Sequence, residues 1–326
     1  MRRRPAVGTR LFARTVHGLE HVAARELRER GGTVLAVSPR QLVVHAPLSL
    51  LDRPPATVDD LFPLVLSIPD PGPTKADLAV LGRAVATSRL TGTPQGDRFS
   101  VSASAAGRRT YNRYDIEDTV GAALAGRFGA AYVSRRDGRR PPPGTVEWRV
   151  TVTGDGVHIG LRGTRPPLHR RPWKVASVPG TLHPPVAAAM LRLAGVRPGD
   201  VVVDPCCGAG TLLAEAPTAM LAGSDIAGVT AARTNAPAIP WFTADARHLP
   251  YPTGSIDHVV TNPPWDRQVA ALGTFTEFVA EWRRVLRPGG RLTYLGPWPP
   301  PAGWQVRTRQ PISLFGQHPT ITVCTR

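Results

Sequence analysis

The stretch TNPPWD, residues 261–266, puts a polar and an aromatic side chain on an unusually stiff backbone. It follows SIDHVV, residues 255–260, whose apolar pattern predicts a buried strand. Two consecutive prolines cannot continue a strand, because neither has an N–H to donate, and they hold the chain in an extended turn. Ligands of open α/β sheets bind at the carboxyl ends of strands. The stretch therefore predicts a binding site in which Asn262 and Trp265 hold a ligand.

A second stretch, VVVDPCCGAGTLL (residues 201–213), places an acid at the end of a predicted strand, followed by a glycine-rich turn into a helix. Gly208 and Gly210 let the backbone approach a ligand closely. A dinucleotide-binding fingerprint needs a third glycine where Leu213 stands, and the Lys-Ser/Thr ending of a phosphate loop is absent. The turn thus favours a ligand without a phosphate.

Acids recur at the ends of three successive predicted strands, as Asp204, Asp225 and Asp245. Asp225 is placed to accept hydrogen bonds from two ribose hydroxyls and Asp245 from an adenine amine, while Asp204 could orient the glycine turn or meet an ammonium group. Each acid alone is as well explained as a helix N-cap or turn residue. The ordered set favours S-adenosylmethionine, and the predicted cofactor-binding residues are Asp204, Cys206, Gly208, Ala209, Gly210, Thr211, Asp225, Ile226, Asp245, Ala246 and Asn262.

The stretch TNPPW resembles that of class I methyltransferases that act on exocyclic amines of bases, and the resemblance implies a particular reaction of that cofactor. An exocyclic amine of a purine is a poor nucleophile, because its lone pair is delocalised into the ring. The side-chain oxygen of Asn262 and the carbonyl of Pro263 offer one acceptor for each amine hydrogen, and Trp265 offers a face for a flipped-out base. Asp266 could take a proton, although a helix N-cap is the simpler interpretation. The predicted catalytic residues are Asn262, Pro263, Pro264, Trp265 and Asp266.

Positive charge is concentrated in the first half of the 326-residue chain. Residues 1–180 hold 28 Lys and Arg against 15 Asp and Glu, a net charge of +13, whereas residues 181–326 hold 12 against 9, a net charge of +3. This asymmetry predicts a polyanion partner, in particular a nucleic acid, although an arginine-rich composition can also reflect a GC-rich genome. The predicted RNA-binding residues are Arg135, Arg136, Arg139, Arg140, Arg170, Arg171 and Lys174.

The remaining composition narrows the class of protein. No apolar run approaches the roughly 18–20 residues that span a bilayer. The basic start lacks the apolar core of a signal peptide, so we expect a soluble protein in the cytoplasm. Three cysteines without a CxxC pair argue against disulfides or structural zinc. His169 and His183 lack partners at metal spacing and are interpreted as RNA-contacting or packing residues, so no metal is expected.

The order of patterns predicts two kinds of region. Residues 18–32 fit a helix, 33–46 a hairpin, 97–107 a strand, 115–129 a helix and 146–163 a second hairpin, which together describe an α+β module. From residue 184 helices and strands alternate, as in a mostly parallel, doubly wound α/β sheet, and two closing strands form an antiparallel edge.

Residues 181–296 resemble the class I S-adenosylmethionine methyltransferases, with DPCCGAGTLLAEA and TNPPW similar to the branch that methylates exocyclic amines of bases. GLRGTRPPLHRRPW, followed by GTLHPPVAAAMLRLAG, resembles the junction in THUMP-domain RNA methyltransferases, nearest the tRNA guanine-N2 enzymes of the acceptor stem. Those enzymes usually carry Tyr-Gly where this chain has Trp265-Asp266. The resemblance implies a Rossmann-like methyltransferase domain after an RNA-binding region, with these boundaries: 1–65 ferredoxin-like, 66–165 THUMP-like, 166–183 linker and 184–326 methyltransferase.

The expected activity is formation of N2-methylguanosine in tRNA, with S-adenosylmethionine as cofactor. One alternative keeps the chemistry and changes the target, to guanine N2 of ribosomal RNA or adenine N6 of a nucleic acid. Others are a non-catalytic RNA-binding protein, which the acids and Asn262 disfavour, and a small-molecule methyltransferase, which the basic first half disfavours. The sequence does not determine the oligomeric state, and a monomer is favoured.

Overall fold

The computed structural model describes residues 8–91, 96–163, 165–216, 219–265 and 273–326. The chain forms two compact units, each built from several segments of the sequence. The first unit contains Met1–Arg14, Leu27–Pro54 and Asp60–Pro167, and the second contains Thr15–Glu26, Pro55–Asp59 and Leu168–Arg326.

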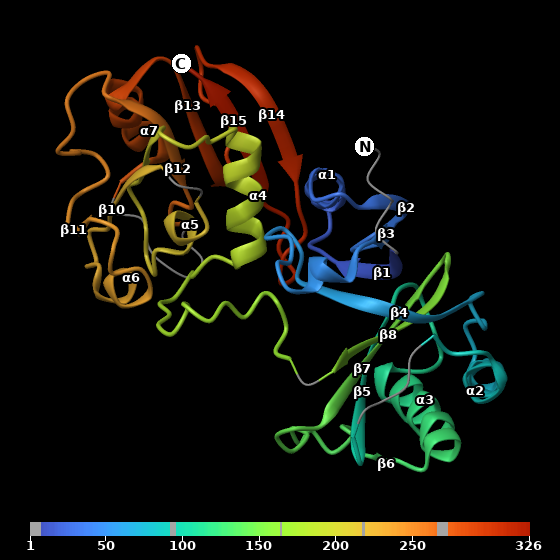
Figure 1. Ribbon diagram of the computed structural model, residues 1–326. Helices are drawn as coiled ribbons and strands as arrows, with labels where there is room; N and C mark the ends of the chain where they lie inside the picture. Colours follow the sequence, from blue (N-terminus) through green and yellow to red (C-terminus); the bar gives the residue numbers. More distant parts are fainter. Residues whose placement is uncertain (1–7, 92–95, 164, 217–218, 266–272) are drawn as a thin grey trace, which may run out of the picture. The chain divides into compact units, whose positions relative to one another are not determined.

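The first unit is built on one eight-stranded sheet with the order β2-β3-β1-β4-β8-β7-β5-β6 (Figure 1). Neighbouring strands are antiparallel, except that β5 pairs in parallel with β6 and β7. The strands are β1 (Thr9–Arg14), β2 (Thr33–Ser38), β3 (Gln41–Ala46), β4 (Asp60–Ile68), β5 (Arg98–Ala105), β6 (Ala131–Tyr132), β7 (Val146–Thr153) and β8 (Gly156–Gly163).

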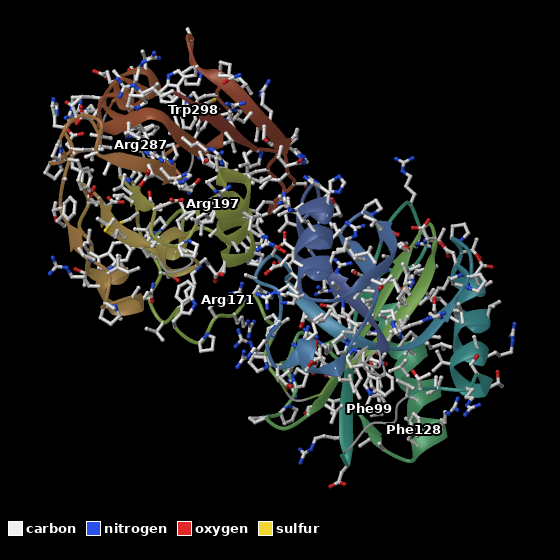
Figure 2. All side chains as sticks on the ribbon, turned by 45° about the horizontal axis from the view of Figure 1, so that its top comes forward. Phe99, Phe128, Arg171, Arg197, Arg287 and Trp298 are labelled. Atoms are coloured by element: carbon white, nitrogen blue, oxygen red, sulfur yellow. The ribbon has the colours of Figure 1, made fainter. Side chains whose placement is uncertain are left out.

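Two helices, α2 (Leu78–Thr87) and α3 (Arg113–Phe128), bury their apolar sides against this sheet. Phe99 of β5 belongs to that core, and Phe128 packs against it from the end of α3 (Figure 2). Short 3-10 turns cover Leu48–Leu51 and Lys75–Asp77. The predicted boundary between residues 65 and 66 falls inside β4, and the division of this unit into ferredoxin-like and THUMP-like regions stays a prediction.

The second unit is built on a seven-stranded sheet with the order β11-β10-β9-β12-β13-β15-β14. The first five strands in this order run parallel, and β15 and β14 complete an antiparallel edge, which confirms the predicted α/β fold. Its strands are β9 (Val201–Asp204), β10 (Met220–Ser224), β11 (Trp241–Phe242), β12 (Ile256–Thr261), β13 (Leu286–Gly296), β14 (Gln305–Pro311) and β15 (Thr320–Thr325).

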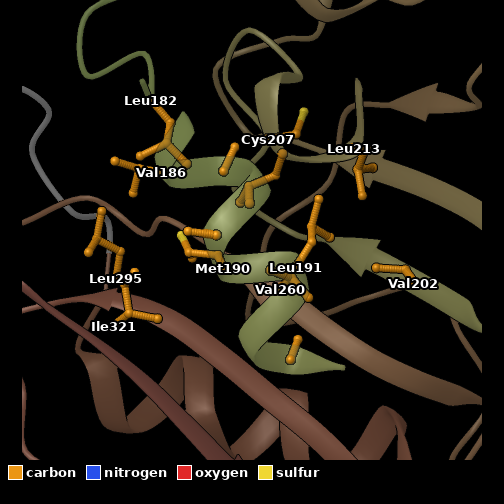
Figure 3. Packing of buried hydrophobic residues seen from close by; sticks show 14 of the residues in the cluster. Leu182, Val186, Met190, Leu191, Val202, Cys207, Leu213, Val260, Leu295 and Ile321 are labelled. Atoms are coloured by element: carbon orange, nitrogen blue, oxygen red, sulfur yellow. The ribbon is translucent and has the colours of Figure 1, made fainter. Parts of the chain in front are cut away.

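Helices cover both faces of this sheet. Alternate residues of a strand point to opposite faces, and here both sets are apolar and are buried against helices. Val202 and Val260 pack with α4 on one face (Figure 3), and Val203 and Val259 pack with α7 on the other. The helices are α1 (Glu20–Glu29), most of which belongs to this unit, α4 (Pro184–Ala194), α5 (Thr211–Ala214), α6 (Thr230–Asn235) and α7 (Phe275–Val285). Within the described ranges, every helix falls short of the length and apolar character needed to cross a membrane.

A buried carboxylate holds two segments of the second unit together. Glu26, on α1, is 2% exposed and accepts hydrogen bonds from the backbone N–H groups of Ala56 (3.0 Å) and Thr57 (2.9 Å). The hydroxyl of Thr57 donates a third bond at 2.7 Å. Burial alone would raise the pKa of Glu26, but these three bonds and the Arg192 guanidinium lower it below its ordinary value.

Glu26→Gln should lower the free energy of unfolding by about 3 kcal/mol, because an amide cannot accept all three hydrogen bonds and its NH₂ group would face backbone donors. Chemical denaturation at neutral pH measures this change. Asp97→Asn, at an exposed position of the first unit, is the control and should change stability little. Since the folded-state pKa of Glu26 is depressed, the stability it contributes is present above about pH 4.5 and is lost as the pH falls. Equal stability of the two variants would contradict this role.

Candidate active site

A cavity of about 320 Å³ lies at the carboxyl ends of the parallel strands in the second unit. The strand order reverses between β9 and β12, and such a reversal opens a crevice for ligands in doubly wound sheets. The lining comes from the glycine turn after β9, the ends of β10, β12 and β13, residues 245–246, residues 178–183, Phe278 of α7 and the β14–β15 hairpin. Most of the predicted site residues meet here: Asp204, Cys206, Gly208, Ala209, Thr211, Asp225, Ile226, Asp245, Ala246, Asn262, Pro263, Pro264 and Trp265.

The glycine turn needs its glycines for two different reasons. Gly208 and Gly210 both adopt positive φ, at 49° and 75°, which disfavours residues with a Cβ. A Cβ on Gly210 would also come within 2.8 Å of the Trp241 ring. Gly210 lies outside the set of cavity-lining residues, whereas Gly208 and its neighbours line the cavity, so the cofactor-binding role of Gly210 stays a prediction.

The carboxylate of Asp225 fixes the shape of that turn from the next strand. Its Oδ2 accepts a hydrogen bond from the Gly208 N–H at 2.9 Å, and its Oδ1 accepts one from the Ala227 N–H at 2.9 Å. Each carboxylate oxygen has a second lone pair available to a ligand. The acid at the end of β10 therefore connects two of the cavity walls.

The two other acids have opposite electrostatic environments. Burial raises the pKa of Asp204 to about 7, with a smaller contribution from the nearby Asp225 charge, although a 3.1 Å bond from the Cys206 N–H opposes the rise. Asp245 is held by Arg247, whose Nη2 donates at 2.7 Å and lowers the pKa of Asp245 to about 2. Asp245 is thus charged throughout the physiological range, whereas Asp204 titrates near neutrality.

The residues after β12 contribute unsatisfied polar atoms to the cavity. The Oδ1 atom of Asn262 and the indole N–H of Trp265 are buried and have no hydrogen-bond partner within the described part of the chain. The Asn262 Nδ2 lies 3.5 Å from the Gly180 carbonyl oxygen, at the limit of a hydrogen bond. Buried polar atoms in native proteins normally have partners, so these atoms point to a ligand. Asp266 lies outside the described residues.

The sequence analysis missed Asn235, at the end of α6. Its Oδ1 accepts from the backbone N–H groups of Val175 and Ala176, both at 2.9 Å. Its Nδ2 donates to the carbonyls of Ala176 and Ala209, also both at 2.9 Å. This side chain joins the glycine turn to the segment leading into residues 178–183. No local pattern in the sequence signals that role, since its partners lie 26 to 60 residues away.

The histidines and cysteines serve packing in this structure. His183 contacts Asp59 through Nε2 at 2.7 Å and packs beside His169, with the ring centres 5.3 Å apart. The residues that the structure describes contain no group of three metal-binding side chains. Burial raises the pKa of both Cys206 and Cys207, so neither thiol is prepared for nucleophilic catalysis.

The predicted RNA-binding side chains differ in exposure and in their bonds within the fold. Arg136, Arg139 and Arg140 are all exposed on the first unit. Arg136 pairs with Asp115 and Asp118 at 2.8 and 2.6 Å, and Arg139 lies 3.3 Å from Asp137. Arg135 is partly buried, 35% exposed and 3.7 Å from Glu147.

Arg170 and its neighbours on the second unit also differ from one another. Arg170 is exposed, but Arg171 (labelled in Figure 2) forms a buried ion pair with Glu215 at 2.6 Å and also bonds the carbonyl of Ala56. Lys174 donates to the Leu182 carbonyl at 2.8 Å, and burial lowers its pKa to about 8. In this structure the cationic groups of Arg171 and Lys174 bond within the fold, and their contact with RNA stays a prediction.

Comparison with known proteins agrees with this geometry. A family model described as an RMKL-like methyltransferase domain matches residues 171–233, and a second, described as a methyltransferase domain, matches residues 203–294. The crystal structure of TrmN from Thermus thermophilus superposes with a TM-score of 0.78 and 27% identity, covering 97% of this chain and 99% of that one.

Two curated relatives have named substrates. The tRNA (guanine(6)-N2)-methyltransferase of Thermus thermophilus is 31% identical over 247 residues, which span 69% of this chain and 71% of that protein. A U6 snRNA (guanine-N(2))-methyltransferase of Bos taurus is 28% identical over 211 residues, spanning 61% of this chain and 40% of that protein. With its class I methyltransferase fold and an enzyme's cofactor cavity, the chain belongs to the S-adenosylmethionine-dependent tRNA guanine-N2 methyltransferase family.

Proposed function

We propose that this protein transfers a methyl group from S-adenosylmethionine to the N2 amine of a guanine in tRNA, at position 6 of the acceptor stem. The relative of Thermus thermophilus, named for that position, supports the substrate. The observation that carries the proposal is the unpartnered, buried Oδ1 of Asn262, which lines the same cavity as the acids and the glycine turn. A single cavity can therefore hold both the methyl donor and the amine.

The residues at the cavity wall fit the cofactor by their chemistry. Asp225 retains lone pairs for the ribose hydroxyls, and Asp245 remains a charged acceptor for the adenine amine. We assign Asp204 to the ammonium group, because a cation beside a buried acid offsets the cost of ionising it. The hydroxyl of Thr211, buried without a protein partner in the described residues, is a further ligand for the aminoacyl end.

The proline turn positions the substrate amine. Asn262 Oδ1 and the Pro263 carbonyl each accept one amine hydrogen, which leaves the nitrogen lone pair directed away from the acceptors. When bound, S-adenosylmethionine supplies a methyl group on a sulfonium. Transfer of that methyl group would leave a surplus proton on the amine nitrogen, which Asn262 Oδ1 and the Pro263 carbonyl would hold in a hydrogen bond until water removes it. Trp265 holds the base by stacking, so the rate depends mainly on positioning.

The exposed arginines of the two units would supply phosphate contacts along the RNA. This set consists of Arg136, Arg139, Arg140 and Arg170, with the partly buried Arg135 beside them, and is smaller than the one predicted from the sequence because Arg171 and Lys174 bond within the fold. We further propose that the protein acts in the cytoplasm, where tRNA is available. We also propose that it acts as a monomer, because one chain contains the whole catalytic cavity.

Asn262→Ala removes the acceptor but keeps the proline turn. It should lower kcat about a hundredfold or more, equivalent to roughly 2–4 kcal/mol, with little change in cofactor affinity. Single-turnover methylation of an unmodified tRNA transcript, followed by nucleoside mass spectrometry, measures this. Trp265→Ala is the contrasting variant and should mainly weaken RNA binding. Full activity of Asn262→Ala would refute the mechanism, and N6-methyladenosine in the wild-type product would transfer the proposal to adenine.

The raised pKa of Asp204 predicts that cofactor binding depends on pH. Its carboxyl is largely protonated at pH 6 and ionised at pH 8, and the bound ammonium favours the ionised form. Affinity should therefore increase roughly tenfold between pH 6 and pH 8, relative to Asp204→Asn. Calorimetry on both proteins measures this, and the comparison cancels titration of the ligand's own amine. Parallel pH profiles for the two proteins would show that Asp204 does not meet the ammonium.

Substitution of Arg170 should affect RNA binding, whereas substitution of its neighbour Arg171 should affect the stability of the fold. Arg170→Ala should flatten the salt dependence of tRNA binding by about one unit of log–log slope and leave stability unchanged, because an exposed phosphate contact is lost. Arg171→Ala should keep the slope but destabilise the fold by about 3–5 kcal/mol, because it leaves Glu215 buried without its partner. Filter binding across ionic strengths and chemical denaturation separate these effects.

The exposed Arg287, near the amino end of β13, serves as a control outside the proposed surface. Arg287→Ala should preserve the salt slope. If Arg170→Ala also preserved it, the segment that carries Arg170 would not touch the RNA backbone.

A further inference from the structure

The tip of the β14–β15 hairpin carries an aromatic residue in an unfavourable backbone conformation. The backbone groups of Leu314 and Gln317 exchange hydrogen bonds in both directions, each 2.9 Å long, around the two-residue loop Phe315-Gly316. Both loop residues have positive φ, 50° and 78°, as a type I′ turn requires. Such turns favour Asn-Gly or Gly-Gly, because a Cβ is disfavoured at positive φ. Phe315 therefore strains the turn that it occupies.

Within the described residues, the strain at Phe315 is not offset by burial of its side chain. Phe315 is 82% exposed, the highest value among the exposed large hydrophobic residues in the described chain. An exposed phenyl ring and a left-handed backbone are both unfavourable, and asparagine or glycine would avoid both. Strained residues of this kind are found at ligand-binding positions, where the surrounding structure maintains them.

The position of the ring indicates which ligand it meets. Phe315 and Trp265 line the same cavity, as does Asn262, the proposed amine acceptor. The ring of His183 meets Phe315 edge-on, with centres 5.6 Å apart and planes at 78°. Asp59 holds His183 in place at 2.7 Å. The phenyl ring is thus supported through an edge contact and remains largely exposed at the cavity.

We propose that Phe315 is a second stacking surface for the substrate base, so that the flipped guanine is held between Phe315 and Trp265. This inference rests on the proposed function, because it takes the ligand to be a base of RNA. A phenyl ring offers a base an apolar π-face without any base-specific hydrogen bond. Phe315 therefore contributes to capture of the base, while Asn262 selects and orients its amine.

The strain makes a substrate-binding role distinguishable from a structural one. Phe315→Asn should raise the melting temperature, since Asn-Gly suits the turn, and should raise the KM for tRNA about tenfold or more. Phe315→Leu should raise KM similarly without stabilising the turn, and Phe315→Trp should retain near wild-type KM. Cofactor affinity, measured by calorimetry, should be unchanged in all three. A residue needed only for folding would instead lose stability in Phe315→Asn.

A tRNA transcript with an abasic site at position 6 tests which base is stacked. If Phe315 contacts the target base, wild type and Phe315→Leu should bind this RNA equally, although they differ on intact tRNA. A difference that persists on the abasic RNA would overturn the assignment in favour of a neighbouring base. Wild-type activity matched by both Phe315→Leu and Phe315→Asn would refute the role of Phe315 alone. A wild type inactive on every tRNA would instead refute the proposed function.

Discussion

The pairing of β9 with β12 is the constraint on which the site depends. These strands follow each other in space but not in sequence, with Val202 opposite His258 and Val203 opposite Val259. In that parallel register, Asp204 and the glycine turn end beside Thr261 and the proline turn. Two stretches more than 50 residues apart are thereby held at one edge of the sheet. Methyl transfer requires the methyl donor and the amine to be in contact, and this strand pairing brings their two binding stretches together.

Local stereochemistry explains which parts of the site the sequence could predict. Glycine at positive φ, proline at a strand end and acids at successive strand ends are each required by the backbone near them, so they are visible as residue types. Asn235 and the Arg171–Glu215 pair are defined by distant partners, and no periodicity reports them. Residues 178–183 line the cavity although their sequence looks like a linker.

The same reasoning explains why the sequence analysis did not predict β4. β4 occupies an interior place in its sheet, between β1 and β8, yet it contains Pro63, which normally excludes a central strand. Pro63 stands in regular register with Leu11 of β1, and the pairing with β8 has an irregular register between Leu64 and Leu66. Net charge misleads in a similar way, because several arginines of the basic half are neutralised inside the fold, as Arg162 is by Asp60 at 2.7 Å. The exposed cationic surface is therefore smaller than the composition suggests.

The hydrogen bonds of Asn235 have a thermodynamic consequence. They join the glycine turn to the chain segment that begins at Arg170 and closes one side of the cavity. If Arg170 contacts RNA as proposed, occupancy of the cavity and RNA binding both act on one continuous piece of backbone. Any factor by which bound tRNA changes the affinity for S-adenosylmethionine must equal the factor by which S-adenosylmethionine changes the affinity for tRNA. The order in which the two ligands arrive is then a matter of kinetics alone, and the free energy of the ternary complex is the same by either route.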